Sequence, residues 1–404
     1  MILCLALGCQ SPGRAGDADG KRQAPPGDSR RFSVTDYGAA GDGKADDSAA
    51  FQKALSALVS AGKGVLHIPA GDYRIGARAS AEVTAAGIAI AGEGQGVSNI
   101  LCDSPEGVFR LRDEWCKSQI TIRDLSFLAT REGAGTAIEV SSPPRGVRNY
   151  RTLLVENVEV RGAGLPTRFY FDCGIKAIAQ WRPLFLNVIF SGVLDPALNQ
   201  DISDSSPFYK PVCGIQADWC YAPSFQNCYV WSAHTGYRIV SEGRPEGPED
   251  CAFYRSNAVG CRVGIDISTP IPEPQLVIES CHINCRDVGI RLNNRKFFYI
   301  TGSLLYGCGR EDEFPYTDIL LTHSFCGVIS GNIFHSPSKD NLKPTPAVNR
   351  TMIRVDGQCR DVSITGNIFN AKGLSMSVEP GATGIATANN IYPNKHTTVP
   401  EGYK

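Results

Sequence analysis

Ionisable side chains recur in the middle of the chain at fixed distances from one repeated apolar residue. That residue is the centre of short Gly-Ile-x-[Ile/Val/Leu]-like segments, at Ile138, Ile175, Ile215, Tyr237, Ile265, Ile290, Ile319 and Ile353. Side chains alternate along a strand, so residues at odd offsets from it are predicted to face solvent. The residues one place later form a charged row, which Arg110 precedes and which continues with Glu139, Lys176, Gln216, Arg238, Asp266, Arg291, Leu320 and Arg354.

Two further rows at odd offsets add ionisable groups. Three places before the apolar residue stand Gly135, Asp172, Val212, His234, Arg262, Asp287, Tyr316 and Arg350, and three places after it the row includes Asp218. The groups concentrate between Asp172 and Arg291, so the site is predicted there. The predicted catalytic residues are Asp172, Asp218, His234 and Asp266, the predicted substrate-binding residues are Lys176, Arg238, Arg262, Asp287 and Arg291, and no metal ligand is predicted.

Arginine and lysine beside carboxylates suit an acidic sugar chain, because guanidinium and ammonium groups hold carboxylates by charge-assisted hydrogen bonds. The competing interpretation is a solvated sheet face, whose alternating charges contribute little to the stability of the fold. Hydrolysis would need two carboxyl groups ~5–9.5 Å apart, for which Asp218 and Asp266 are candidates. Elimination would need a base beside a uronate carboxylate. His234 or Lys176 suits that role better than Arg238 or Arg291, because the pKa of arginine exceeds ~12.

Glycines, aromatic residues and long insertions border the same region. The glycines directly before the repeated apolar residue could form a floor for a ligand or could ease the turn into the strand; they are Gly174, Gly214, Gly236, Gly264 and Gly289. Aromatic rings stack on sugars, although ordinary packing explains each ring as well; the rings are Trp181, Trp219, Tyr221 and Trp231. Insertions at residues 190–212 and 241–250 are typical of loops that build a cleft wall.

A second strand repeats along the chain with variable spacing, which is typical of a solenoid. It contains a small or polar slot, filled by Asp124, Asn157, Asn187, Asn227, Ser256, Ser280, Gly302, Gly331, Gly366 and Asn389. Stacked Asn side chains in this slot could hydrogen-bond along the solenoid axis. The residues three places later are predicted to form one interior stack: Phe127, Val160, Phe190, Val230, Val259, Ile283, Leu305, Phe334, Phe369 and Tyr392.

The start of the folded region carries a specific pattern. An extended segment and a Gly-rich turn from Phe32 lead to Asp46 or Asp47, predicted to cap a helix over residues 48–59, and a strand–turn–strand follows from Val65. Residues 32–75 resemble the N-terminal signature of the pectate-lyase-like superfamily, which includes polygalacturonases, rhamnogalacturonases and phage tailspikes. The resemblance implies an all-β fold, a right-handed parallel β-helix whose open end this helix caps.

The resemblance does not extend to the polygalacturonase catalytic pattern. Asp172 and His234 match two of its positions, but Pro-Val-Cys213-Gly-Ile stands where that family has its central Asp pair, and no Arg-x-Lys follows. In lyases of the superfamily an Arg or Lys can be the base and calcium often assists. No cofactor is therefore predicted, with calcium considered only for a lyase.

Composition limits the remaining alternatives. The chain has 404 residues, a formal net charge of −1 and 15 cysteines. That charge disfavours a nucleic-acid partner, and no apolar run is long enough for a transmembrane span. Same-slot cysteines, Cys173 with Cys213 and Cys261 with Cys285, are predicted to be free interior thiols rather than disulfides.

Domain organisation and location follow from the N-terminus. Residues 1–9 resemble a bacterial lipoprotein signal that ends at Cys9, which predicts a secreted or cell-envelope protein, lipid-anchored through Cys9. The predicted division is a signal segment and tether over 1–31, a single β-helix over 32–394 and a tail over 395–404.

Three functions fit these observations. The leading one is an enzyme, a polysaccharide lyase or glycoside hydrolase, that cleaves a uronate-containing polysaccharide or oligosaccharide. The alternatives are a non-catalytic glycan-binding or adhesive β-helix, and a sugar epimerase or intramolecular glycosyl transferase. The oligomeric state stays open between a monomer and a homotrimer.

Overall fold

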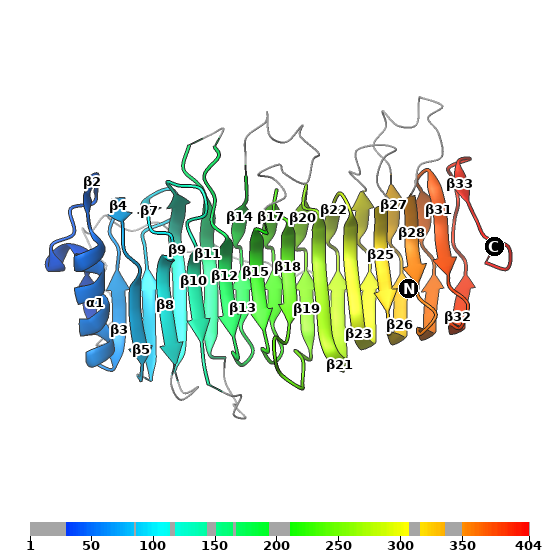
Figure 1. Cartoon of the computed structure of the whole chain (residues 1–404), viewed down its shortest axis with the longest axis horizontal. Helices are drawn as coiled ribbons and strands as arrows, with labels where there is room; N and C mark the ends of the chain where they lie inside the picture. The colour runs from blue at the N-terminus through cyan, green and yellow to red at the C-terminus, as the bar shows by residue number, and fades with distance from the viewer. Residues whose placement is uncertain are drawn as a thin grey trace, which may run out of the picture.

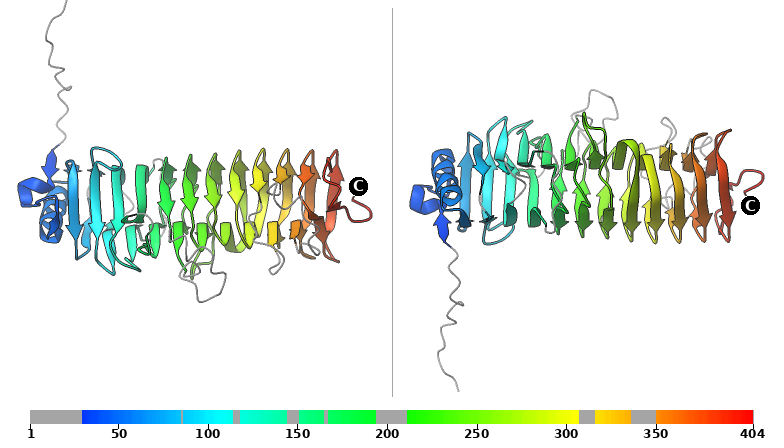
Figure 2. Two further views of the ribbon diagram at one scale, coloured as in Figure 1. Left: turned by 90° about the horizontal axis from the view of Figure 1, so that it is seen from above. Right: turned by 90° about the horizontal axis from the view of Figure 1, so that it is seen from below.

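A computed structural model describes residues 30–403, apart from residue 85 and residues 114–117, 144–150, 165–166, 194–210, 307–315 and 336–349. The chain winds into coils whose strands stack side by side from the helix α1 at one end to the C-terminus at the other (Figures 1 and 2). All strand pairs with a stated register are parallel, and the described residues contain one α-helix. The predicted all-β fold, a right-handed parallel β-helix with a capping helix, is confirmed.

The coils form three parallel sheets, which we call A, B and C. Sheet A consists of β5 (Ala79–Val83), β8 (Gly107–Asp113), β10 (Thr136–Ser141), β12 (Cys173–Ile178), β15 (Cys213–Asp218), β18 (Thr235–Val240), the first parts of β21 (Val263–Glu279) and β23 (Val288–Thr301), β25 (Tyr316–Thr322), β28 (Arg350–Val355), β31 (Gly373–Val378) and β33 (Thr397–Thr398).

Sheet B consists of β1 (Arg31–Ser33), β3 (Lys63–His67), β6 (Gly87–Ala91), the first parts of β9 (Gln119–Ala129) and β11 (Leu153–Gly162), β13 (Leu184–Leu186), β16 (Ser224–Gln226), β19 (Cys251–Tyr254), the second parts of β21 and β23, β26 (Phe325–Ser330), β29 (Arg360–Thr365) and β32 (Thr383–Ala388). Sheet C consists of β2 (Asp42–Asp46), β4 (Gly71–Ile75), β7 (Ser98–Cys102), the second parts of β9 and β11, β14 (Ile189–Ser191), β17 (Tyr229–Trp231), β20 (Asn257–Val259), β22 (His282–Asn284), β24 (Leu304–Tyr306), β27 (Ile333–His335) and β30 (Ile368–Asn370).

The predicted register of sheet A is confirmed. Ile138 pairs with Ile175, and the pairing continues from coil to coil through each predicted inward residue to Ile353. These residues are fully buried, because an apolar residue at every second position can only be covered inside the coil. The charged row is therefore also in register, with Arg110 beside Glu139 and Arg238 beside Asp266.

The small or polar slot has a backbone cause. Its residues mark the turn between sheets B and C. Apart from Ser256 they adopt positive φ, from 51° at Asn227 to 65° at Gly331, which Asn and Gly tolerate best. The Asn157 amide donates to Asp124 Oδ1 at 2.8 Å, as predicted for stacking along the axis. A longer ladder runs one residue further on, where Asn332 Nδ2 donates to Asn367 Oδ1 at 3.0 Å.

Two slot assignments are wrong by one residue. The positive φ lies at Arg255 (48°), not at Ser256, and the stacked interior residue is Ala258, not Val259. An arginine in this turn gave no sequence signal, whereas the Ser256 hydroxyl resembles the slot residues of other coils. Ser256 instead joins the ladder, accepting from the Cys228 amide at 3.3 Å.

The glycines before the apolar residue do not form a floor for a ligand. A Cβ on Gly214 would lie 2.7 Å from a methyl of Val230 inside the coil and 2.5 Å from the Gly236 carbonyl oxygen. All five glycines are buried. Interior side chains and the backbone of the next coil occupy the space where a side chain would lie. Glycine at these positions therefore allows close packing.

The outward assignment is also wrong at the C-terminal end of the same rows. Asp318 and Arg350 are buried and form an ion pair of 2.7 Å, and the Tyr316 hydroxyl donates to Asp318 at 2.9 Å. Burial raises the pKa of Asp318 to about 6. The register of β25 with β28 leaves out Asp318 and its neighbour Met352, so the regular alternation of the strand is interrupted there.

The helix α1 (Ser48–Ser60) covers the N-terminal end of the coils (Figure 1). Phe51, Leu55 and Leu58 are fully buried against the first coils, as predicted. Asp47 precedes the helix, but its carboxylate accepts from the amides of Ala40 (2.6 Å) and Gly41 (3.3 Å). Asp47 therefore secures the Gly-rich turn instead of capping the helix with its side chain.

The cysteines of the described residues are all free, and all except Cys326 are buried. Cys173 and Cys213 occupy paired positions, as predicted. In the part of the chain that the structure describes, no helix is long and apolar enough to cross a membrane. The predicted signal and the lipidated Cys9 lie outside the described residues, so export, anchoring and the division at residues 31 and 394 stay predictions.

Candidate active site on the outward face of sheet A

The charged row lies along the outward face of sheet A, with one residue for each coil. Neighbouring strands are about 4.8 Å apart, so the row repeats at that interval along the solenoid axis. Its centre is formed by Gln216 on β15, Arg238 on β18, Asp266 on β21 and Arg291 on β23. Gln216 is buried, whereas the other three are half-buried.

Asp266 is the most unusual group of the row. Its Oδ2 lies 3.5 Å from Arg291 Nη1, but its Oδ1 is buried and has no hydrogen-bond partner. Burial raises the pKa of Asp266, and the charges of Arg291, Arg238 and His234 oppose that shift. A buried carboxylate oxygen without a partner is costly, so a ligand that donates a hydrogen bond would stabilise it.

Gln216 offers the complementary group on the other side of Arg238. Its Oε1 accepts from Arg238 Nη1 at 3.4 Å, while its buried Nε2 has no hydrogen-bond partner. An unpaired donor and an unpaired acceptor thus lie in one row, two coils apart, with a guanidinium between them. Hydroxyl and carboxylate groups of a sugar could satisfy both.

A second set of groups lies at the edge where the chain enters sheet A. Arg262 Nε donates to Asp287 Oδ2 at 2.6 Å, and His234 lies one coil away with Nδ1 3.1 Å from Thr235 Oγ1. Burial lowers the pKa of His234, and the positive charge of Arg262 lowers it further. His234 is therefore neutral at neutral pH and able to accept a proton.

The structure gathers six of the nine predicted residues on, or directly before, three neighbouring strands. They are His234, Arg238, Arg262, Asp266, Asp287 and Arg291. Asp266 and Arg291 contribute to the field at His234, which places both rows in one electrostatic environment.

The other three lie apart from this centre. Asp172 is exposed two coils earlier and accepts from the Gly135 amide at 3.1 Å. Asp218 is buried and accepts from the Glu242 amide at 3.0 Å. Burial raises the pKa of Asp218, and Lys176, one coil earlier, is among the charges that oppose the shift. The strand spacing and the rise per residue place the backbones of Asp218 and Asp266 roughly 12 Å apart.

The insertion at residues 241–250, which we call the wall loop, adds two residues that sequence reasoning missed. Glu242 Oε1 lies 3.0 Å from Arg238 Nη1, and the Arg244 guanidinium lies 4.0 Å from the centre of the Trp219 ring. The length of the insertion was the only signal for them. Among the predicted aromatic residues, Trp181 and Tyr221 stack on each other at 3.9 Å, whereas Trp231 is 42% exposed.

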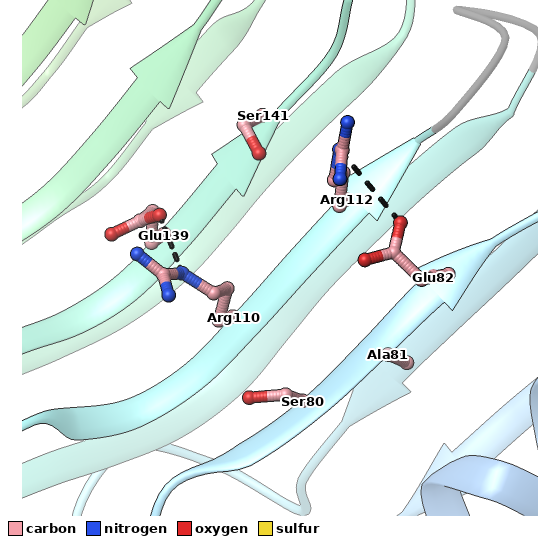
Figure 3. Close-up of a pocket in the computed structure, with 7 residues that line it drawn as sticks. All are labelled: Ser80, Ala81, Glu82, Arg110, Arg112, Glu139 and Ser141. Carbon is pink, nitrogen blue, oxygen red and sulfur yellow. Dashed lines mark hydrogen bonds and ion pairs between the residues drawn. The ribbon is translucent and has the colours of Figure 1, made fainter.

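A hollow of ≈ 280 Å³ lies further toward the N-terminus on the same face (Figure 3). It is lined by Ser80, Ala81, Glu82, Arg110, Arg112, Glu139 and Ser141. Arg110 pairs with Glu139 at 2.8 Å, and Arg112 lies 3.8 Å from Glu82. The N-terminal part of the charged row therefore consists of ion pairs beside a hollow. At its centre, Gln216 and Asp266 each have one polar atom without a hydrogen-bond partner.

Calcium does not fit the centre of the site. Calcium takes six to eight oxygen ligands, but Asp266 and Asp287 each face a guanidinium. No group of three or more His, Cys, Asp or Glu side chains in the described part of the chain could hold a metal ion.

Comparison with known proteins adds to this geometry. A family model described as rhamnogalacturonase A/epimerase, pectate lyase-like, matches residues 31–108. The resemblance to the pectate-lyase-like superfamily is confirmed.

Solved structures share the fold. The A-module of the Azotobacter vinelandii mannuronan C-5 epimerase AlgE4 superposes with a TM-score of 0.62 at 17% identity. The match covers 92% of this chain and 100% of that module. A surface adhesin of Streptococcus pneumoniae, PfbA, has a TM-score of 0.55 at 13% identity, with 91% and 92% covered. Such identities show the fold alone.

Two curated relatives carry names of enzymes. Mannuronan C5-epimerase AlgE4 of A. vinelandii is 32% identical over 142 residues, which are 32% of this chain and 26% of the relative. Alginate lyase 7 of the same organism is 39% identical over 88 residues, 21% of this chain and 9% of the relative. The chain therefore spans about a quarter or less of the length of these curated relatives.

Proposed function

We propose that this protein is an enzyme that acts on a uronate-containing polysaccharide by removing the hydrogen beside the sugar carboxylate, and that its reaction is epimerisation. The observation that carries the proposal is Asp266, a half-buried carboxylate with one buried and unpaired oxygen, set between Arg238 and Arg291 on an outward sheet face. The names of the curated relatives, an epimerase and a lyase, belong to two reactions that share this first step.

The residues present can support that step. Arg291 and Arg238 would hold the uronate carboxylate and offset the negative charge that builds up on it when the adjacent C–H bond breaks. His234, kept neutral by burial, would accept the proton. Asp266, with its raised pKa, would return a proton to the same carbon from the other side, which inverts that carbon without net loss or gain of atoms.

Elimination is the second candidate, because one curated relative is a lyase. It begins with the same proton transfer, but the glycosidic C–O bond then breaks, a C=C bond forms and the leaving oxygen takes a proton. Hydrolysis has weaker support. The Asp218 carboxylate accepts a hydrogen bond from the wall loop. Its backbone lies roughly 12 Å from that of Asp266, so the two side chains would have to converge to reach the carboxyl separations of ~5–9.5 Å that glycosidases use.

The test is incubation of the purified protein with polymannuronate, polygalacturonate and a neutral glucan in deuterium oxide, followed by proton NMR and near-ultraviolet absorbance. Epimerisation incorporates deuterium beside the carboxylate at constant chain length. Elimination produces unsaturated ends that absorb. Reducing ends without either signal would show hydrolysis, and binding without turnover would show a non-catalytic glycan-binding protein; each would overturn the proposal.

A further inference from the structure

The wall loop is fastened to the β-helix at three places. The Glu242 amide donates to Asp218 Oδ1 at 3.0 Å, and the Gly247 amide donates to Glu273 Oε1 at 2.7 Å. The Pro248 carbonyl accepts from Arg295 Nη1 at 2.6 Å. A loop of ten residues with three such attachments, two of them to buried carboxylates, is held in one position.

Arg295 is the least expected of these partners. It is fully buried, and its guanidinium bonds two backbone carbonyls, of Pro248 and of Gln275 (3.0 Å). Within the described residues it has no carboxylate at ion-pair distance, and its Nε has no hydrogen-bond partner. Glu273 is its register partner on β21, yet that carboxylate accepts from the wall loop. Burying a guanidinium without a counter-ion is costly, and its two hydrogen bonds join the wall loop to β21.

The loop also packs too closely to shift inward. A Cβ on Gly247 would overlap the Thr269 side chain and would lie 2.9 Å from Glu273 Cγ. Gly247 and Pro248 are both buried. Glycine is thus required where the loop meets β21, independently of the contact with Arg295.

The fastened loop places two charged residues at the candidate site. Glu242 pairs with Arg238, and Arg244 covers Trp219 and contributes to the field at Asp218. We propose that Arg295 is a positioning residue: it fixes the wall loop, and the fixed loop sets how an anionic sugar chain reaches Arg238. The inference rests on the proposed function for its substrate, while the fastening itself rests on the contacts of the wall loop with Asp218, Glu273 and Arg295.

The test uses the full chain with Arg295→Met, Gly247→Ala and the conservative Arg295→Lys. A Glu-specific protease would probe the Glu242–Gly243 bond, with each cleavage site identified by mass spectrometry. We expect cleavage at this bond about tenfold faster in both Arg295→Met and Gly247→Ala. Arg295→Met removes one attachment, and the Cβ of Gly247→Ala overlaps β21, so each change raises the open fraction of the loop. Arg295→Lys should restore part of the protection. For polymannuronate, KM should rise about tenfold with kcat within about twofold, as expected when ground-state and transition-state binding weaken together.

Arg350→Met is the matched control, because Arg350 is also a buried arginine but lies on β28, away from the wall loop. It should lose stability without faster cleavage at Glu242 or a higher KM. Folded Arg295→Met and Gly247→Ala proteins that are cleaved at the wild-type rate would overturn the fastening. Faster cleavage with unchanged KM would overturn the link to substrate. A wild type inactive on every uronate polymer would refute the proposed function and the substrate part of this inference, while the protease result would still decide the role of Arg295.

Discussion

Two aspartates on the outward side of sheet A show how surroundings decide chemistry at the residue scale. Asp172 is exposed, and its carboxylate accepts a hydrogen bond from the Gly135 amide. Asp266 is half-buried among arginines, its pKa is raised, and one of its oxygens lacks a hydrogen-bond partner. Both sit at odd offsets in the same repeat, so residue type and spacing alone ranked them equally.

Replacing Asp266 should remove most of the activity. We expect Asp266→Asn to lower kcat on a uronate polymer by about 10²–10⁴-fold, the usual contribution of a positioned acid or base. Asp172→Asn is the matched control and should retain kcat within about twofold. Equal losses in the two variants, measured by NMR turnover, would contradict the proposed site.

The pH dependence should report His234. Because burial and Arg262 lower its pKa, His234 becomes protonated only below its ordinary value of 6.5. A protonated histidine cannot act as the base, so kcat/KM should fall as the pH drops through that lowered pKa. In His234→Gln the remaining activity should lack this acid limb. A profile with the same acid limb in both proteins would exclude His234 as the base.

At the scale of single elements, tight turns and buried pairs hold the coils in register. The turn between sheets B and C needs one residue with positive φ in each coil, and Asn or Gly usually fills it. Near the C-terminal end, Asp318 on β25 and Arg350 on β28 tie neighbouring coils through a buried ion pair. A buried ion pair stabilises the folded state little more than an apolar pair of the same size would. Removing one partner, however, leaves the other charge buried and uncompensated.

Arg350→Met should therefore destabilise the protein by about 3–5 kcal/mol, because Asp318 stays buried without its counter-ion. Denaturant unfolding followed by circular dichroism would measure the change. The double variant Asp318→Asn with Arg350→Met should recover much of the loss. A double variant as unstable as the single one would show that packing, and not the unpaired carboxylate, causes the loss.

At the scale of the whole molecule, parallel stacking turns a repeat in the sequence into one long row of charges on one face. The hollow beside Arg110 and the centre at Asp266 belong to the same row, five coil steps apart along sheet A. The net charge of −1 conceals this arrangement, since the row gathers arginines that the rest of the surface balances.

A polyanionic substrate held by this row should bind less well at high salt. Half-exposed charges are screened over a Debye length of about 8 Å at 0.15 M ionic strength and about 3 Å at 1 M. KM for polymannuronate should therefore rise severalfold over that range, with kcat nearly constant. A KM that does not depend on salt would indicate that neutral hydroxyl contacts dominate binding.

The amino-acid pattern was sufficient to predict the β-helix, the capping helix and the register of sheet A. The reason is that period-two alternation around a repeated isoleucine allows one way to bury the apolar residues, and stacking then aligns the charged row. Only the three-dimensional structure showed the direction of the glycines, the turn at Arg255 and the buried pair of Asp318 with Arg350, because interrupted pairing and irregular turns break the alternation at these points. It also decided which predicted residues meet, and it fastened the wall loop through Arg295. Those contacts join residues from different coils and depend on burial and on turns of irregular length. Local sequence patterns do not predict either of these.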